Sequence, residues 1–341
     1  MSAHGAAAVV GGGSWGTALA RLLAAKGRDV RLWVRDPALA ATIETRRENP
    51  RYLPGARLDG RVRATADLEG ALAGATLVVS AVPSHVVRSV MSEAAVHVDG
   101  GSVVVSASKG IEEGSLKRMT EVLEEVLGRG EGLTVLSGPS FATEVARGVP
   151  TAVTVAAHDP EVAESVREAF FAPRFRVYTS DDVVGVELGG AVKNVVAIAT
   201  GIADGLEYGS NARAALITRG LAEISRLGTA LGGRRLTFMG LAGLGDLVLT
   251  CTGELSRNRT VGLRLGRGET LEAILADMDQ VAEGVRSTRS VRDLAARHGI
   301  EMPIVEQVHE MLYHAKRPQI VVEELMTRES KPEFQAAHQE S

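Results

Sequence analysis

Two patterns of apolar residues alternate through the first half of the chain. Short, continuously apolar runs rich in valine predict strands, and stretches with apolar residues every three or four positions predict helices. Continuously apolar strands are typical of a parallel sheet that helices cover on both faces. The predicted strands cover residues 7–10, 29–34, 76–81, 102–106, 134–137, 151–156 and 175–178, and the predicted helices cover 16–25, 84–95 and 115–127.

The pattern changes at about Asp182, after which no strand is predicted. Helical spacing continues in residues 184–203, 212–231, 271–278, 287–298 and 304–313. We therefore predict two domains, an α/β domain in residues 1–182 and an all-helical domain in 183–327. The polar segment 328–341 is predicted to be a loose tail.

Composition excludes several classes of function. The 341 residues include 38 Lys and Arg and 42 Asp and Glu, so the net charge of −4 leaves no basic surface for nucleic acid. The single cysteine, Cys251, cannot form an intrachain disulfide, and one thiol does not make a zinc site. We expect no metal and a reducing, cytoplasmic location.

Two apolar segments could be taken for membrane or export signals. The N-terminal run at residues 6–10 is too short for a signal peptide core. The longer run that begins near residue 183 contains Glu187, Lys193 and Asn194, which are costly at the centre of a bilayer. We therefore predict neither export nor a membrane span.

A glycine-rich segment follows the first predicted strand and opens the first predicted helix. Gly11, Gly13 and Gly16 have the G-x-G-x-x-G spacing of dinucleotide-binding loops. Such glycines allow a tight turn and close approach of a diphosphate to the positive end of the helix. The context predicts that the first domain is a Rossmann-type doubly wound sheet that binds a dinucleotide.

The second predicted strand ends in Arg35 and Asp36, about 20 residues beyond the glycines, where a contact with the adenosine ribose is expected. An acid there suits the 2′-hydroxyl of NAD, and an arginine suits the 2′-phosphate of NADP. Both residue types are present, and both could also be solvated loop charges. We favour NADP(H), with NAD(H) as a usable alternative.

Further polar residues follow three other predicted strands. Because ligands bind beyond the carboxyl ends of strands in open α/β sheets, Lys109, Gly138, Ser140 and Ala142 are candidates to face one crevice. A loop lysine is ordinarily solvated, so Lys109 alone would be weak support for a site.

Lys193 lies in the middle of an apolar helical segment, and a buried ammonium needs a partner, water or a function. At steps of four residues it shares a row with Gly189, Ala197 and Gly201, all of them small. One interpretation is a structural ion pair with tight helix packing. The other is an active-site lysine whose surroundings are kept small for cofactor and substrate.

A second cluster of polar residues occurs further along. Glycines at 240, 243 and 245 predict a tight loop that holds Asp246, and Ser256, Arg257 and Asn258 offer donors to an oxyanion such as a phosphate. The same segment could equally be a capped, solvated turn. Cys251 has no activating neighbour in the sequence and is expected to be a small buried residue.

These motifs together resemble bacterial NAD(P)-dependent glycerol-3-phosphate dehydrogenase, in order and over nearly the whole chain to about Glu310. They are GGGSWGTALA (11–20), SKG (108–110), LSGPSFA (136–142), GAVKN (190–194), AGLGDL (242–247), SRN (256–258) and VAEG (281–284). The resemblance implies reversible hydride transfer between NAD(P)H and dihydroxyacetone phosphate, giving sn-glycerol 3-phosphate for glycerophospholipid synthesis. It also implies a dinucleotide-binding domain followed by a helical one.

The resemblance implies roles for individual residues. Those implied to contact cofactor, besides the three glycines, are Ser14, Trp15, Arg35, Lys109, Ala142, Arg257, Val281 and Glu283. Those implied to contact substrate are Lys109, Gly138, Ser140, Lys193, Asp246, Ser256, Arg257 and Asn258. Lys193 is implied to transfer the proton, and Lys109 and Asp246 complete the predicted catalytic set. If the two lysines converge, their repulsion lowers at least one ammonium pKa, and Asp246 moderates this effect.

Two other functions remain open on the sequence. A β-hydroxyacid-type dehydrogenase would share the first domain and a helical lysine-asparagine pair, but it would bind a carboxylate. A non-catalytic NAD(P)H-sensing module would keep the glycine loop and would need no acid. The sequence leaves the oligomeric state undecided, with a homodimer as one option.

Overall fold

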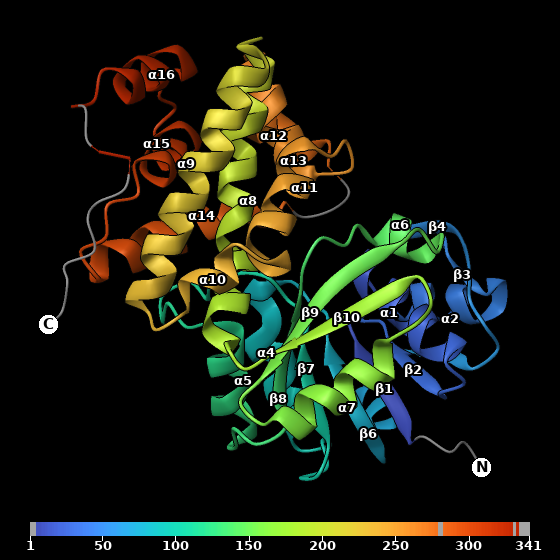
Figure 1. Ribbon diagram of the computed structural model, residues 1–341. Coiled ribbons are helices and arrows are strands. Elements are labelled where there is room, and N and C mark those ends of the chain that lie inside the picture. The colour runs from blue at the N-terminus through green and yellow to red at the C-terminus, as the bar shows by residue number, and fades with distance from the viewer. Residues whose placement is uncertain (1–4, 279–281, 330–331, 334–341) are drawn as a thin grey trace, which may run out of the picture.

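An eight-stranded sheet forms the N-terminal half of the computed structural model, which describes residues 5–278, 282–329 and 332–333. The strand order is β10-β9-β8-β7-β6-β1-β2-β5 (Figure 1). Its strands are β1 (Ala6–Val10), β2 (Val30–Trp33), β5 (Val62–Thr65), β6 (Ala75–Ser80), β7 (Val103–Ser106), β8 (Leu133–Ser137), β9 (Thr151–Ala157) and β10 (Phe175–Ser180). Seven of these match predicted strands to within one or two residues at each end.

The direction of two strands differs from the prediction. Six strands, from β8 across to β5, are parallel, but β9 pairs antiparallel with β8 and parallel with β10. The prediction of a wholly parallel sheet was therefore wrong at this edge. Apolar runs report burial and carry no information on strand direction. The edge strand β5 and the small sheet of β3 (Glu48–Asn49) and β4 (Leu53–Arg57) were not predicted, because polar residues interrupt them.

Helices cover both faces of the sheet, as a doubly wound fold requires. Alternate residues of β1 point to opposite faces. Ala7 and Val9 belong to the apolar core under α1 (Ser14–Ala25) and α7 (Pro160–Phe170). Ala8 and Val10 belong to the core under α4 (Val87–Ala95) and α5 (Met119–Leu127). The remaining helices of this half are α2 (Pro37–Arg46), α3 (Leu68–Leu72), the short turn η1 (Ser84–Val86) and α6 (Ala142–Ala146).

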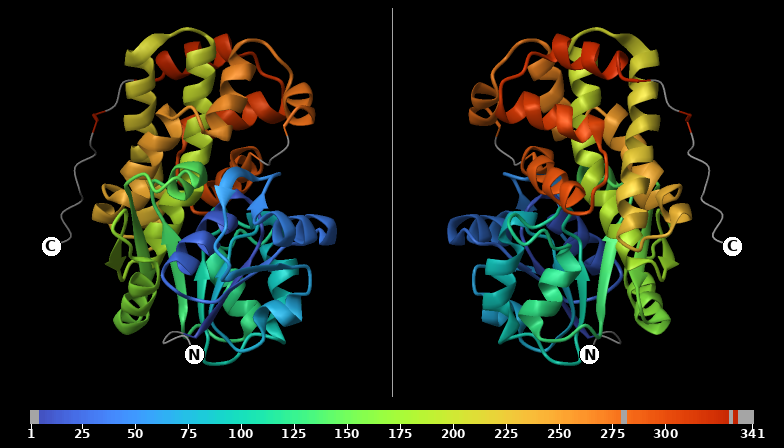
Figure 2. Two further views of the ribbon diagram at one scale, coloured as in Figure 1. Left: turned by 90° about the vertical axis from the view of Figure 1, so that its right-hand side faces the viewer. Right: turned by 90° about the vertical axis from the view of Figure 1, so that its left-hand side faces the viewer.

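The second half is helical throughout its described residues, which confirms the predicted fold class (Figure 2). The last strand ends at Ser180 and the first long helix begins at Val183. The helices are α8 (Val183–Gly205), α9 (Gly209–Ala230), α10 (Arg235–Phe238), η2 (Leu241–Gly245), α11 (Asp246–Thr252), α12 (Arg257–Gly266), α13 (Leu271–Ala276), α14 (Glu283–Arg297), α15 (Pro303–Tyr313) and α16 (Pro318–Met326). Helices α10, η2, α11, α12 and α16 were not predicted.

Helix α8 is the core of this half, and the other helices surround it (Figure 1). It is long and apolar enough to cross a bilayer, but 94% of its apolar window is buried inside the protein, as expected for a core helix. Helix α12 packs against it unusually closely. A Cβ added to Gly201 would lie 2.1 Å from the carbonyl oxygen of Arg259, and one added to Gly262 would lie 2.0 Å from that of Ile198. This close packing brings the start of α12 next to Lys193.

Candidate functional site

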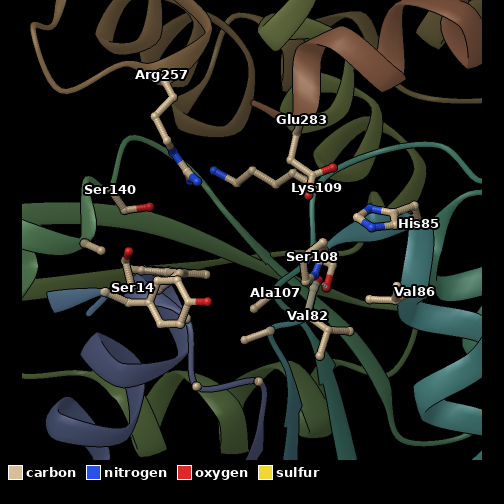
Figure 3. A pocket seen from close by; sticks show the side chains of 18 of the residues that line it. Ser14, Val82, His85, Val86, Ala107, Ser108, Lys109, Ser140, Arg257 and Glu283 are labelled. Carbon is tan, nitrogen blue, oxygen red and sulfur yellow. Dashed lines mark hydrogen bonds between the residues drawn. The ribbon is translucent and has the colours of Figure 1, made fainter. Parts of the chain in front are cut away.

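A cavity of about 600 Å³ lies between the carboxyl ends of the central strands and the helical half (Figure 3). Lys109 and Arg257 extend into it, with Ser14 and Ser140 on one side and His85 and Glu283 on the other. Of the predicted site residues, its wall includes Gly11, Gly13, Ser14, Trp15, Arg35, Lys109, Ser140, Ala142, Lys193, Ser256, Arg257, Asn258 and Glu283. Gly16, Gly138 and Asp246 lie directly behind the wall, and Val281 lies outside the described residues.

The glycine loop connects β1 to the start of α1. Gly11 has φ +120°, and a Cβ there would lie 2.8 Å from the backbone of Ala81. A Cβ on Gly16 would lie 1.9 Å from the carbonyl oxygen of Gly11, so both positions require glycine. Gly13 is the N-cap residue of α1, where no side chain caps the helix and an added Cβ would meet nothing within 4 Å. The positive end of α1 is therefore open to the cavity, and this arrangement fits the diphosphate of a dinucleotide.

The end of β2 carries Arg35 and Asp36. Asp36 is the N-cap residue of α2, and its Oδ1 accepts hydrogen bonds from the backbone N–H of Ala38 at 2.9 Å and Leu39 at 3.4 Å. Its other oxygen lies 4.0 Å from Nη1 of Arg51. Both Arg35 and Arg51 line the cavity. Arg51 was not among the predicted residues, because nothing in its local sequence distinguishes it from a surface arginine.

Asp246 lies between the two lysines. Its Oδ1 accepts a hydrogen bond from Lys193 Nζ at 2.5 Å, and its Oδ2 accepts one from Lys109 Nζ at 2.6 Å. Lys109 also donates to the carbonyl oxygen of Gly138 at 3.2 Å, and Lys193 donates to the Thr250 hydroxyl at 2.8 Å. The Asp246 side chain is 1% exposed and that of Lys193 is 8% exposed. One buried carboxylate thus holds two ammonium groups at the edge of the cavity.

The environment of Lys193 shifts its titration. The pKa of Lys193 is lowered to about 8, mainly by burial and to a smaller extent by the Lys109 ammonium, while the Asp246 carboxylate opposes both effects. The sequence predicted both burial and repulsion between the lysines, and burial is the larger cause. A lysine with this pKa is able to give up and take back a proton near neutral pH.

The segment at residues 256–258 is the N-terminus of α12 and not a solvated turn. Ser256 is the N-cap residue, and its hydroxyl accepts from the backbone N–H of Arg259 at 3.2 Å. Asn258 is buried. Its Nδ2 donates to Oδ1 of Asn194 at 3.0 Å, and its Oδ1 accepts from the backbone N–H of Gly284 at 2.8 Å. Asn258 therefore connects α12 to both α8 and α14.

Glu283 closes the cavity from the helical half. It is the first residue of α14, and its Oε2 accepts a hydrogen bond from the Ser84 hydroxyl at 2.7 Å. Ser84 begins η1, directly after β6, so this bond joins the sheet half to the helical half across the cavity. The Asn258–Gly284 bond lies one residue further along α14. The two bonds together tie α14 to η1 on one side and to α12 on the other.

One prediction about this region needs correction, and one of the alternatives for Lys193 finds support. The glycines before Asp246 form a π-helical turn, η2, that continues into α11, and not a loop. The small residues flanking Lys193 serve helix packing, because a Cβ on Gly189 would lie 2.6 Å from the carbonyl oxygen of Ala242. Lys193 thus forms a buried ion pair in a tightly packed helix and also lines the cavity, and its catalytic role stays a prediction.

Besides Arg51 and His85, two polar residues near Lys193 were not predicted. Asn194 directly follows Lys193, and Thr250 lies one helical turn after Asp246; both line the cavity. The spacing of four residues between Asp246 and Thr250 was the available signal. Cys251 is fully buried as predicted, and burial raises the pKa of its thiol to about 12, which makes it unreactive.

Comparison with known proteins covers almost the whole chain. Residues 6–163 match the family described as NAD-dependent glycerol-3-phosphate dehydrogenase N-terminus, and residues 182–323 match the corresponding C-terminus. The glycerol-3-phosphate dehydrogenase (NAD(P)+) of Nitratidesulfovibrio vulgaris strain Hildenborough is 56% identical over 327 residues, which are 96% of this chain and 99% of the relative. That of Anaeromyxobacter dehalogenans strain 2CP-C is 56% identical over 330 residues, with the same coverage.

A solved structure from the same family has the same fold. The crystal structure of glycerol-3-phosphate dehydrogenase from Coxiella burnetii superposes with a TM-score of 0.91 at 44% sequence identity, covering 95% of this chain and 99% of that one. The sheet and the helical half therefore occur together in a solved structure.

Proposed function

The chain belongs to the NAD-dependent glycerol-3-phosphate dehydrogenases, and from this premise we propose which of its residues carry the reaction and which cofactor it prefers. Its activity is the reduction of dihydroxyacetone phosphate to glycerol 3-phosphate with NAD(P) as the redox partner, an oxidoreductase reaction of phospholipid metabolism. The single observation that carries the proposal is the Asp246 carboxylate held between two lysine ammonium groups at the edge of the cavity.

Lys193 is the proposed proton donor. The nicotinamide, when bound, supplies the hydride. A reduced ketone carbonyl becomes an alkoxide, which needs a proton and nearby positive charge. Lys193 supplies the proton, and Lys109 supplies a second ammonium next to the same carboxylate. Asp246 orients both lysines, and its negative charge keeps the buried Lys193 protonated more often than burial alone would allow.

The substrate phosphate is proposed to bind at the start of α12. Ser256, Arg257 and Asn258 at this end of the helix line the cavity, and the Arg257 side chain extends into it (Figure 3). A helix N-terminus with an arginine is a strong anchor for a phosphate dianion. Asn258 is proposed to position this turn, because it ties the turn to α8 and α14.

Asn258→Ala is therefore expected to raise the KM for dihydroxyacetone phosphate about tenfold, with a smaller change in NADPH affinity. The substitution leaves the buried Asn194 oxygen and Gly284 N–H without their partner, so the start of α12 loses its position. Steady-state kinetics and a fluorescence titration with NADPH measure the two effects. The exposed Asn211→Ala is the matched control, and an unchanged KM in Asn258→Ala would refute the positioning role.

NADPH is the proposed preferred reductant. Arg35 and Arg51 both line the end of the cavity beyond β2, where they supply two positive charges for a 2′-phosphate. Asp36, the acid that would bind the ribose of NAD, uses Oδ1 to cap α2 and has its other oxygen near Arg51. It is therefore poorly placed to accept from a 2′-hydroxyl.

Arg35→Ala is expected to weaken NADPH binding about tenfold to a hundredfold and NADH binding much less, because only NADPH offers the 2′-phosphate. Direct titration of both cofactors measures the difference. The exposed Arg46→Ala, at the far end of α2, controls for loss of general positive charge. Equal losses for NADPH and NADH would show that Arg35 does not bind the phosphate.

The family match sets aside the two alternatives that the sequence left open, a β-hydroxyacid-type dehydrogenase and a non-catalytic sensing module. We propose a cytoplasmic location, which the single buried cysteine and the buried apolar helix α8 support. A homodimer remains one option for the assembly, and light scattering after size-exclusion chromatography distinguishes it from a monomer.

A further inference from the structure

Two histidines and a glutamate meet at the C-terminal end of α15, away from the cavity described above. Nδ1 of His309 lies 3.6 Å from Oε1 of Glu310, and Nε2 of His314 lies 3.9 Å from the same oxygen. The three atoms are all within 4.8 Å of one another. Two imidazoles and one carboxylate are a common set of protein ligands for zinc.

His309 has an unusual environment. It is 5% exposed, and among the described residues its Nδ1 has no hydrogen-bond partner. Buried polar atoms are nearly always hydrogen-bonded, so a buried ring nitrogen without a partner needs an explanation. This nitrogen faces Glu310 at a distance too long for a hydrogen bond but suited to a shared ligand.

We propose that His309, Glu310 and His314 bind one divalent transition-metal ion of the zinc class, with water completing its coordination. At a tetrahedral Zn²⁺ with bonds of about 2.0–2.1 Å, the ligand atoms lie about 3.3–3.4 Å apart. The Glu310 oxygen lies 3.6 Å and 3.9 Å from the two nitrogens, and no two ligand atoms are more than 4.8 Å apart, so the side chains have to move closer by up to about 1.5 Å to share one ion. The His314 side chain is 59% exposed and follows the last residue of the helix, so it is free to make that movement.

The charges around the cluster permit such an ion. Arg292 on α14, a cation that acts on His309, is held by Glu306, with its Nε 2.9 Å and 3.1 Å from the two carboxylate oxygens, and Arg289 on the same helix lies over the ring of Tyr313. Nitrogen ligands favour zinc or cobalt over magnesium, which prefers oxygen.

The position of the proposed metal site predicts how a bound ion affects the stability of the protein. The His309 ring lies 4.9 Å from the ring of Tyr313, and the Tyr313 hydroxyl donates to the carbonyl oxygen of Val285 on α14 at 2.7 Å. A bound ion would fix the end of α15 and, through Tyr313, its contact with α14. We therefore expect the ion to stabilise the helical half, since a ligand that binds only the folded state raises its stability.

Zn²⁺ titration of tag-free protein by calorimetry tests the proposal, with thermal melts run alongside. Wild type is expected to bind one Zn²⁺ per chain at micromolar concentration and to melt at higher temperature with Zn²⁺ present. Glu310→Gln and His314→Ala, both at positions open to solvent, are each expected to weaken binding by about tenfold or more. His298→Ala removes an exposed histidine outside the cluster and is expected to bind like wild type.

Two outcomes would overturn the proposal. One is wild type taking up no Zn²⁺ in this range, or taking up Mg²⁺ equally well. The other is that Glu310→Gln and His314→Ala bind Zn²⁺ as wild type does, once circular dichroism shows that both variants are folded. The ion would then lie elsewhere.

Discussion

Lys193→Ala is expected to lower kcat for dihydroxyacetone phosphate reduction by about 10²–10⁴-fold while leaving NADPH affinity largely intact. Loss of one general acid typically has an effect of this size. Lys193 bonds to Asp246 and Thr250 in the helical half, whereas the glycine loop and Arg35 are in the sheet half. The cofactor site is therefore expected to persist without it.

Stopped-flow turnover and an NADPH titration check this expectation, with circular dichroism to show that the variant is folded. The Asp246 carboxylate keeps Lys109 as a partner in the variant, so it is not left as an unpaired buried charge. Lys26→Ala, at the exposed end of α1, is the matched control. A Lys193→Ala variant with more than half the normal rate would end the assignment of Lys193 as proton donor.

The lowered pKa of Lys193 also predicts a pH dependence. Reduction requires the ammonium form, which is present below the pKa and lost above it. The wild-type kcat/KM for reduction should therefore fall as pH rises through about 8, and the oxidation of glycerol 3-phosphate should show the opposite trend. The residual activity of Lys193→Ala should not show this fall of kcat/KM near pH 8.

Arg257→Ala is expected to lower kcat/KM for dihydroxyacetone phosphate by about 10²–10⁴-fold. Loss of charge-assisted bonds to the phosphate accounts for about tenfold to a hundredfold, and poorer positioning of the ketone accounts for the rest. Because the phosphate is remote from the reacting carbonyl, kcat should fall as well as KM rise.

The control for Arg257→Ala is Arg267→Ala, which removes an exposed arginine at the other end of α12. NADPH affinity is measured in parallel, because Arg257 is also expected to contact the cofactor. If Arg257→Ala kept the wild-type kcat/KM, the phosphate would have to bind elsewhere in the cavity.

Much of the fold was predictable because its periodicity is strong. The central strands and the helices α1, α8 and α15 have clear apolar spacing, and their predicted bounds agree with the structure within a few residues. Helix α12 was missed because it contains Asn258, Thr260 and two glycines, which are all weak helix formers. Its contact with α8 stabilises it, and such tertiary contacts do not appear in local sequence.

Site residues were predictable where their type or spacing is unusual for the surrounding sequence. Lys193 stands out as a charge in an apolar helix, and Gly11, Gly13 and Gly16 stand out by spacing. Arg51 gave no such signal, because only the fold brings it beside Asp36. The pairing of Asp246 with both lysines joins residues 53 and 137 positions apart in the chain, which spacing cannot reveal.

The comparison of dihydroxyacetone phosphate with unphosphorylated dihydroxyacetone tests the account of this site most directly. NADPH oxidation by the wild-type enzyme is followed with each ketone at a series of concentrations. The account predicts that kcat/KM for the phosphate ester exceeds that for dihydroxyacetone by about 10³-fold or more, because only the ester is held at the start of α12 beside Lys193. Equal efficiency with the two ketones would contradict it.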